Sequence, residues 1–255
     1  MYLKALPLIV LPSTKSPVNQ AIFRINSAVC AFFRQALVSK GFIEIHSTKF
    51  QESGTESGAA VFKVDYFRHP AFLAQSPQLA KQMAIAADME RVFEIGPVFR
   101  AENSNTHRHL TEFTGLDLEM AIENHYHEVI DVIDEVILTI FRGLQSEYQA
   151  EVSMPLIMGW LEHSTPSFQI ETIKKLFPHE DIVFLDKTLR LTFKEGIQLL
   201  REGGSKDDGI EPSEEEDLNT AAERELGRLV KERYGTDYFI LGGSAAHYVF
   251  DTCPG

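Results

Sequence analysis

Residues 96–120 constrain the fold of this chain more than any other segment. An apolar stretch leads to Arg100, a polar loop follows, and the chain returns through Phe113. From residue 116 onward, apolar residues alternate with Asp117 and Glu119. Such alternation is typical of a strand that has one buried face. The segment therefore predicts an antiparallel hairpin with a long polar tip.

This hairpin would carry an arginine, carboxylates and an aromatic ring toward one common surface. A nucleotide needs these groups, because a guanidinium binds phosphate, a carboxylate accepts from the amine of adenine, and a ring stacks on the base. We therefore interpret residues 96–120 as a candidate nucleotide site. The alternative is a surface hairpin in which Arg100 and Glu102 form an ion pair, since short motifs also arise by chance.

Helices and strands are expected on both sides of the hairpin. Apolar spacing, Pro, Gly and capping residues predict helices at 17–40, 76–89, 126–148, 193–202 and 221–234, and strands at 42–46, 60–66, 71–74, 92–100, 113–122 and 237–241. Thr192 with Glu195, and Thr220 with Glu223, have capping-box spacing. Residues 150–187 are expected to be irregular, with short helices. Hairpin strands flanked by helices indicate an α+β fold.

The string Thr-His-Arg-His-Leu-Thr-Glu-Phe at 106–113, followed by Gly-Leu-Asp-Leu-Glu-Met at 115–120, resembles motif 2 of class II aminoacyl-tRNA synthetases. Within that family it is similar to the aspartyl-tRNA synthetases of the archaeal and eukaryotic cytosolic type. The resemblance covers most of residues 18–241. It implies an α+β fold with a class II synthetase-like antiparallel sheet flanked by helices.

The resemblance also divides the chain. Residues 1–17 are expected to be an N-terminal extension, and residues 18–241 a partial class II catalytic domain with an acidic loop at 203–217. Residues 242–255 do not match the family and are expected to form a divergent tail. Motif 3, with its ATP-binding arginine and magnesium-binding acid, is not recognised, so the domain is expected to be truncated before that motif.

Composition places fewer constraints on function. The net charge is −13, but seven acids and one lysine lie in residues 203–217, so the charge neither supports nor excludes RNA binding. No uninterrupted apolar run approaches the roughly 20 residues that span a bilayer, so no membrane partner is expected. Cys30 and Cys253 are far apart and outside any ligand spacing, which favours a cytoplasmic protein without structural zinc.

The resemblance implies an ATP site on the hairpin. Arg100, the expected catalytic residue, would bind the α-phosphate and its developing charge. Glu102 would meet the adenine amine or the end of the tRNA, and Phe113 would stack on adenine. Arg108 and His109 would hold the terminal phosphates. His109 and its neighbour at 107 also have the spacing of a metal pair, but no third ligand is near in sequence, so no metal site is expected.

The resemblance also implies an aspartate site. Ser76 begins a helix, and Gln78 and Lys81 are three residues apart, which places them on one helical face. Lys81 and Gln78 would hold the side-chain carboxylate of aspartate. Glu56 in a small-residue loop and Asp117 would hold its α-ammonium. A solvent-facing Gln–Lys pair is the alternative interpretation.

The implied function is aspartate–tRNA ligase: ATP with Mg2+ activates L-aspartate to aspartyl-adenylate, and the aspartyl group passes to tRNA(Asp). Thr111 and Glu112 would lie near the tRNA acceptor end, and the Mg2+ ligands are expected beyond residue 255. Residues 41–50 resemble motif 1, the dimer-interface element, so a homodimer is expected. Two alternatives stay open: an asparaginyl-type synthetase or amide-forming paralogue, and a noncatalytic paralogue that acts as an interaction protein.

Overall fold

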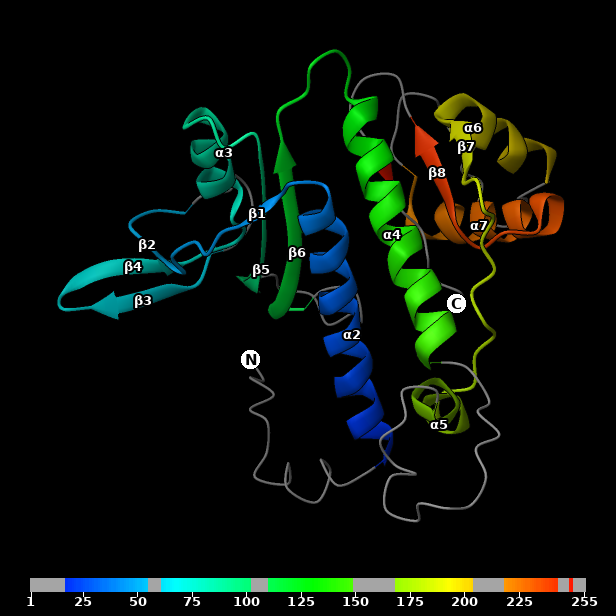
Figure 1. The fold of residues 1–255 in the computed structure, drawn as a ribbon, viewed down its shortest axis with the longest axis horizontal. Coiled ribbons are helices and arrows are strands. Elements are labelled where there is room, and N and C mark those ends of the chain that lie inside the picture. The colour runs from blue at the N-terminus through cyan, green and yellow to red at the C-terminus, as the bar shows by residue number, and fades with distance from the viewer. Residues whose placement is uncertain are drawn as a thin grey trace. The chain divides into compact units, whose positions relative to one another are not determined.

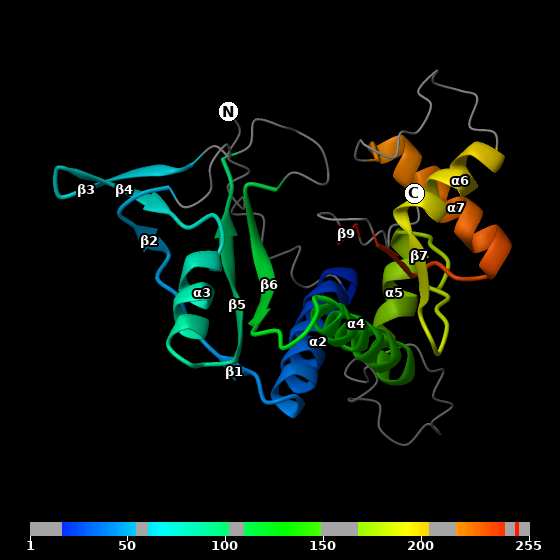
Figure 2. The same ribbon diagram turned by 90° about the horizontal axis from the view of Figure 1, so that it is seen from above.

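The computed structural model describes residues 17–54, 61–101, 110–148, 168–203, 218–242 and 248–249. The chain divides into two compact units, Met1–Leu176 and Phe177–Gly255. Figures 1 and 2 show the ribbon of both units in two views. Each unit contains helices packed on a small sheet.

The first unit is built around a three-stranded sheet in the order β1-β5-β6. In chain order its elements are α2 (Pro17–Ser39), β1 (Ile43–Glu44), β2 (Phe50–Gln51), β3 (Lys63–Tyr66), β4 (His69–Leu73), α3 (Gln78–Ala86), β5 (Arg91–Phe99), β6 (Glu112–Met120), α4 (His127–Tyr148) and α5 (Phe168–Leu176). β5 and β6 are the predicted hairpin strands and pair antiparallel from Arg91↔Met120 to Phe99↔Glu112. β1 pairs parallel to β5, and β2, β4 and β3 form a second, antiparallel sheet.

The two faces of the hairpin pack against different helices. Figure 2 shows α3 on one side of β5 and β6, with α2 and α4 on the other. On the side of α2 and α4, Phe93 of β5 meets the ring of Phe33 edge-on, with centroids 5.9 Å apart. The core on that side consists of Phe33, Ala36, Leu37, Phe42, Phe93, Val132 and Val136. The opposite face, toward α3, is therefore the one left for polar side chains.

The second unit has the sheet order β7-β8-β9. Its elements are β7 (Leu189–Thr192), α6 (Phe193–Glu202), α7 (Thr220–Tyr234), β8 (Phe239–Gly242) and β9 (Tyr248–Val249). β7 and β8 are parallel, and β8 and β9 are antiparallel. The apolar core of this unit consists of Leu191, Ile197, Leu199, Leu200, Leu226, Val230, Phe239 and Leu241.

Capping residues begin both helices of the second unit. The predicted capping box at Thr192 is present, because its hydroxyl accepts from the amide of Glu195 and the Glu195 carboxylate accepts from the Thr192 amide. The predicted box at Thr220 is wrong. The side chain of Asn219 accepts from the amide of Ala222 instead, which makes Thr220 the first helical residue. Both residue types are good caps, and the structure uses the earlier one.

The predicted α+β class is confirmed, although the parallel pairings of β1 with β5 and of β7 with β8 were not expected. One further feature differs from the sequence analysis. Residues Val18–Ser39 of α2 are long and apolar enough to cross a bilayer, judged by length and composition alone. The core helix of a soluble protein passes the same test, and Phe33 and Leu37 of α2 lie in the core of the first unit.

Candidate functional site

The hairpin face toward α3 carries most of the described residues that the sequence analysis selected. Residues directly opposite each other in an antiparallel pair project to the same face, and alternate residues along a strand share that face. The register pairs Glu94 with Asp117, Gly96 with Gly115, and Val98 with Phe113. We call these six residues, together with Glu119, the site face.

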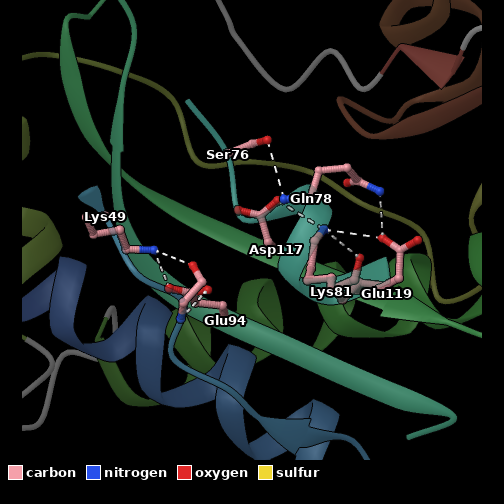
Figure 3. A network of polar contacts seen from close by, with 9 residues as sticks. Lys49, Ser76, Gln78, Lys81, Glu94, Asp117 and Glu119 are labelled. Atoms are coloured by element: carbon pink, nitrogen blue, oxygen red, sulfur yellow. Dashed lines mark hydrogen bonds and ion pairs between the residues drawn. The ribbon is translucent and has the colours of Figure 1, made fainter. Parts of the chain in front are cut away.

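Lys81 of α3 is the centre of the polar contacts on the site face. Its side chain is almost fully buried, and its Nζ lies 3.3 Å from Asp117 Oδ1 and 3.5 Å from Glu119 Oε2. Lys81 Nζ also donates to the carbonyl of Leu118 at 3.2 Å. Figure 3 shows these contacts. A buried ammonium needs such partners, because withdrawing its charge from water costs on the order of several kcal/mol.

The start of α3 brings two more predicted residues to this cluster. Gln78 Nε2 donates to Glu119 Oε2 at 3.1 Å, and the Gln78 amide donates to Ser76 Oγ at 3.4 Å. Gln78 and Lys81 share a helical face because three residues nearly complete a turn. The structure therefore brings together four of the predicted aspartate-binding residues: Ser76, Gln78, Lys81 and Asp117.

Glu119 is a member of this cluster that the sequence analysis did not select. It contacts both Gln78 and Lys81, so it orients the two side chains that the sequence analysis assigned to substrate recognition. The period-two alternation of β6 contained the signal, because Asp117 and Glu119 had to lie on one face. The spacing did not reveal that a helical lysine would reach both.

A second buried ion pair lies on the same face and was also missed. Glu94 is 2% exposed, and its carboxylate accepts from Lys49 Nζ and, at 3.1 Å, from the amide of Ser47. Burial alone would raise the pKa of Glu94. The hydrogen bonds from Lys49 and Ser47 outweigh burial and hold the pKa of Glu94 below its ordinary value. A carboxylate within an otherwise apolar strand was the available signal.

The pair Gly96–Gly115 forms a strip without side chains of its own between these charged groups and Phe113. A Cβ atom at Gly96 would come within 2.9 Å of Glu94 Oε1, and one at Gly115 within 2.8 Å of Asp117 Oδ2. Real Cβ atoms do not make such short contacts. Both carboxylates therefore lean over the glycine pair, and any larger residue would push them away. Glycine at both positions therefore lets these carboxylates lie close to the backbone.

The described residues that were predicted to bind ATP or to lie near the tRNA acceptor end gather at the far end of the hairpin. The guanidinium carbon of Arg100 lies 5.7 Å from the ring centroid of Phe113, within the range of a cation–π contact. The amide of Arg100 donates to the carbonyl of Thr111 at 3.0 Å, and Glu112 pairs with Phe99. Arg100, Thr111, Glu112 and Phe113 are thus neighbours at one end of the site face.

Four predicted site residues, Glu56, Glu102, Arg108 and His109, lie outside the described residues. Within the described ranges, no group of three or more His, Cys, Asp or Glu side chains is arranged to hold a metal ion. The described part of the candidate site consists of a buried lysine, carboxylates, an arginine and an aromatic ring.

Comparison with known proteins connects this geometry to a family. The family of class II tRNA synthetases (D, K and N) matches residues 10–250. The chain is 50% identical over 227 residues to the cytoplasmic aspartate–tRNA ligase of Mus musculus and 48% identical over 225 residues to cytoplasmic aspartate–tRNA ligase 1 of Dictyostelium discoideum. The match to the mouse ligase covers 89% of this chain and 41% of that protein, and the match to the Dictyostelium ligase covers 88% of this chain and 35% of that protein.

Solved structures agree with this assignment. The aspartyl-tRNA synthetase of Entamoeba histolytica matches with a TM-score of 0.68 and 40% identity, over 91% of this chain and 39% of that one. An asparaginyl-tRNA synthetase of Pyrococcus horikoshii matches with a TM-score of 0.67 at 24% identity, which supports the fold alone. The match to residues 10–250 and the relatives at about 50% identity lead to one conclusion: this chain belongs to the class II tRNA synthetase family.

Proposed function

We propose that this chain activates L-aspartate as part of an aspartate–tRNA ligase. The observation that carries the proposal is the cluster in which buried Lys81 lies beside Asp117 on the site face. A lysine ammonium that is withdrawn from solvent attracts a carboxylate more strongly than a neutral amide, so Lys81 favours aspartate over asparagine. The chain spans 41% of the length of the mouse ligase that it resembles, so the activity of the whole ligase is itself part of the proposal.

The amino acid would lie between α3 and the site face. Lys81 and Gln78 would bind its side-chain carboxylate, while Asp117, Ser76 and Glu56 would receive its α-ammonium. Lys81 has three donors, so it can keep a contact with its own carboxylates when a substrate carboxylate enters. The α-carboxylate would then point along the glycine strip toward Arg100.

ATP would occupy the strip and the far end of the hairpin. Phe113 would stack on adenine, and Arg100 would bind the α-phosphate. The α-carboxylate of aspartate attacks the α-phosphorus, and the bond to the leaving pyrophosphate breaks. Arg100 stabilises the charge that develops in this step. We assign the adenine amine to Glu102 and the terminal phosphates to Arg108 and His109. Mg2+ bound to the triphosphate would supply further charge neutralisation.

The second substrate and the assembly follow from the same family. A ribose hydroxyl of the terminal nucleotide of tRNA(Asp) would take the aspartyl group, with Thr111 and Glu112 near the acceptor end, in the cytoplasm. A homodimer is supported by apolar side chains on α2 and β1 that stay exposed: Phe23 at 61%, Val38 at 56% and Ile43 at 50%. Large apolar side chains that stay exposed favour a protein partner.

The test is exchange of pyrophosphate into ATP, measured with aspartate and with asparagine. We expect aspartate to be preferred by more than about 100-fold, because an ion pair in a closed site is worth several kcal/mol. Equal rates would support the asparaginyl-type alternative. Binding of aspartate and ATP without any exchange would support the noncatalytic alternative.

A further inference from the structure

The Lys49–Glu94 pair has no part in the proposed function so far, although its position is unusual. Glu94 is as deeply buried as the core residues around it, and it accepts from both Lys49 and Ser47. Lys49 Nζ also donates to Ser47 Oγ at 2.9 Å. A buried pair of this kind contributes little to net stability, because desolvation cancels most of the attraction. Its retention on the site face therefore calls for another reason.

The pair lies directly beside the proposed aspartate site. Glu94 is the cross-strand partner of Asp117, and the Cβ atoms of such partners are about 4.5–5.5 Å apart. Both carboxylates lean over the Gly96–Gly115 strip, as the short distances to a Cβ at either glycine show. Figure 3 shows the Lys49–Glu94 pair and the Lys81–Asp117 pair in one view.

The charges facing Asp117 come from every element packed around it. Lys81 comes from α3, Glu119 from its own strand, Glu94 from β5, and Lys49 from the segment that leads into β2. Without Lys49, three carboxylates would share a single lysine. Aspartate brings two more carboxylates and one ammonium, so such a site would repel its substrate.

Resting on the proposed function, we propose that Lys49 and Glu94 are positioning residues of the aspartate site. Glu94 occupies the space across from Asp117 and keeps that carboxylate directed toward Lys81. Lys49 cancels the charge of Glu94, so that Asp117 is the carboxylate that attracts the α-ammonium. Neither Lys49 nor Glu94 is assigned a contact with the substrate.

This role predicts effects of opposite sign for the two partners. Lys49→Met leaves Glu94 uncompensated, and we expect it to weaken binding of L-aspartate at least about tenfold, the effect of one unpaired charge nearby. Glu94→Gln keeps the shape and the hydrogen bond from Ser47 but removes the anion, so aspartate should bind as well as in the wild type or better. The double variant should bind more tightly than Lys49→Met alone.

A purely structural pair would behave differently. Both single variants would then lower the midpoint of thermal unfolding and weaken the site together, and the double variant would not recover affinity. Lys49→Arg keeps the charge and should retain wild-type affinity, which keeps the proposal testable if Lys49→Met fails to fold. The exposed pair Arg34–Glu44 offers a matched control, since Glu44→Gln removes an ion pair next to the same sheet without changing the site face.

The measurement is isothermal titration of the full chain with L-aspartate and, separately, with an aspartyl-adenylate analogue that has a sulfamate in place of the phosphate. Absence of binding to the wild type would overturn the proposed function itself. Binding to the wild type, with equal affinity for Lys49→Met, would overturn only the positioning role. Titration of the control variant Glu44→Gln with aspartate and with ATP should match the wild type.

Discussion

The site face in the first unit and helix α7 in the second unit hold their charges in opposite ways. On the site face, Lys81 and Glu94 are 3% and 2% exposed and contact oppositely charged groups from other elements. On α7, Arg228 contacts Glu225 and Glu232, which lie three and four residues away on the same exposed helix surface. Exposed pairs of this type contribute little to stability, whereas breaking a buried pair is costly because it leaves an unpaired charge in the protein interior.

The largest effect is expected at Arg100. We expect Arg100→Ala to lower the rate of adenylate formation by about 2–4 kcal/mol of transition-state stabilisation, because the guanidinium acts on charge that develops during the reaction. Pyrophosphate exchange measures this rate, and circular dichroism checks that the fold is retained. Wild-type turnover by Arg100→Ala would show that the hairpin is not the ATP site.

The next effect concerns Lys81. Lys81→Met should weaken aspartate binding by about 100-fold and remove the preference for aspartate over asparagine, since the buried cation is lost. Lys231→Met is the matched control, because Lys231 also contacts two carboxylates, those of Glu180 and Asp237, but lies on the exposed surface of the second unit. Equal losses of aspartate affinity in both variants would show that the burial of Lys81 does not account for its effect.

The pattern of the sequence was sufficient for the hairpin but not for its contacts. Period-two alternation predicted β6, and the Ser-Pro signal predicted where α3 begins, because both are local properties of the chain. Lys49 and Glu94 are 45 residues apart in the sequence, and β1, which pairs with β5, has only two residues, Ile43 and Glu44. Contacts between segments this distant or this short leave no periodic signal, so Lys49 could not be foreseen as the partner of Glu94.

The sequence predicted which residues form the candidate aspartate site, but not all of the contacts among them. Ser76, Gln78, Lys81 and Asp117 are brought together as expected, while Glu119 contacts two of them without having been selected. The resemblance supplied the residues, but only the packing of α3 on the hairpin shows that Lys81 already has two carboxylate partners. The division of the chain after residue 176 had no compositional signal either.

Acid should affect the two regions differently. The pKa of Glu94 is held below its ordinary value, so its stabilising effect is complete above the ordinary carboxyl pKa and is lost as the pH falls through the lowered pKa. The pKa of Glu225 is lowered as well, by Arg228, but that pair is exposed and salt screens it. Denaturant unfolding of Glu94→Gln should therefore show a weaker loss of stability on acidification, in low and high salt alike.

The corresponding change in Glu225→Gln should be visible only in low salt. If the two variants respond to salt in the same way, the difference in burial between Glu94 and Glu225 does not control their contribution. Lys49→Met provides a second check, because it removes the cation that lowers the pKa of Glu94.

A smaller effect is expected where the second unit depends on a local cap. Thr192→Ala removes the hydroxyl that accepts from Glu195 and should lower the free energy of unfolding by about 0.5–2 kcal/mol. Thr220→Ala should have almost no effect, because Asn219 is the capping residue of α7. Thermal unfolding of the two variants tests this prediction. Equal losses of stability would show that Thr220 caps α7.

The smallest effect is expected at Arg228. Its hydrogen bonds to Glu225 and Glu232 raise its pKa, yet the guanidinium is solvated and both partners lie on the same helix. Arg228→Gln keeps a long polar side chain with good helix propensity, so the midpoint of unfolding should not change measurably and aspartate binding should be unaffected. A clear fall in the midpoint would mean that the α7 pairs act as a cooperative network. The exposed charges of α7 would then contribute to stability, and the contrast with the buried charges of the site face would fail.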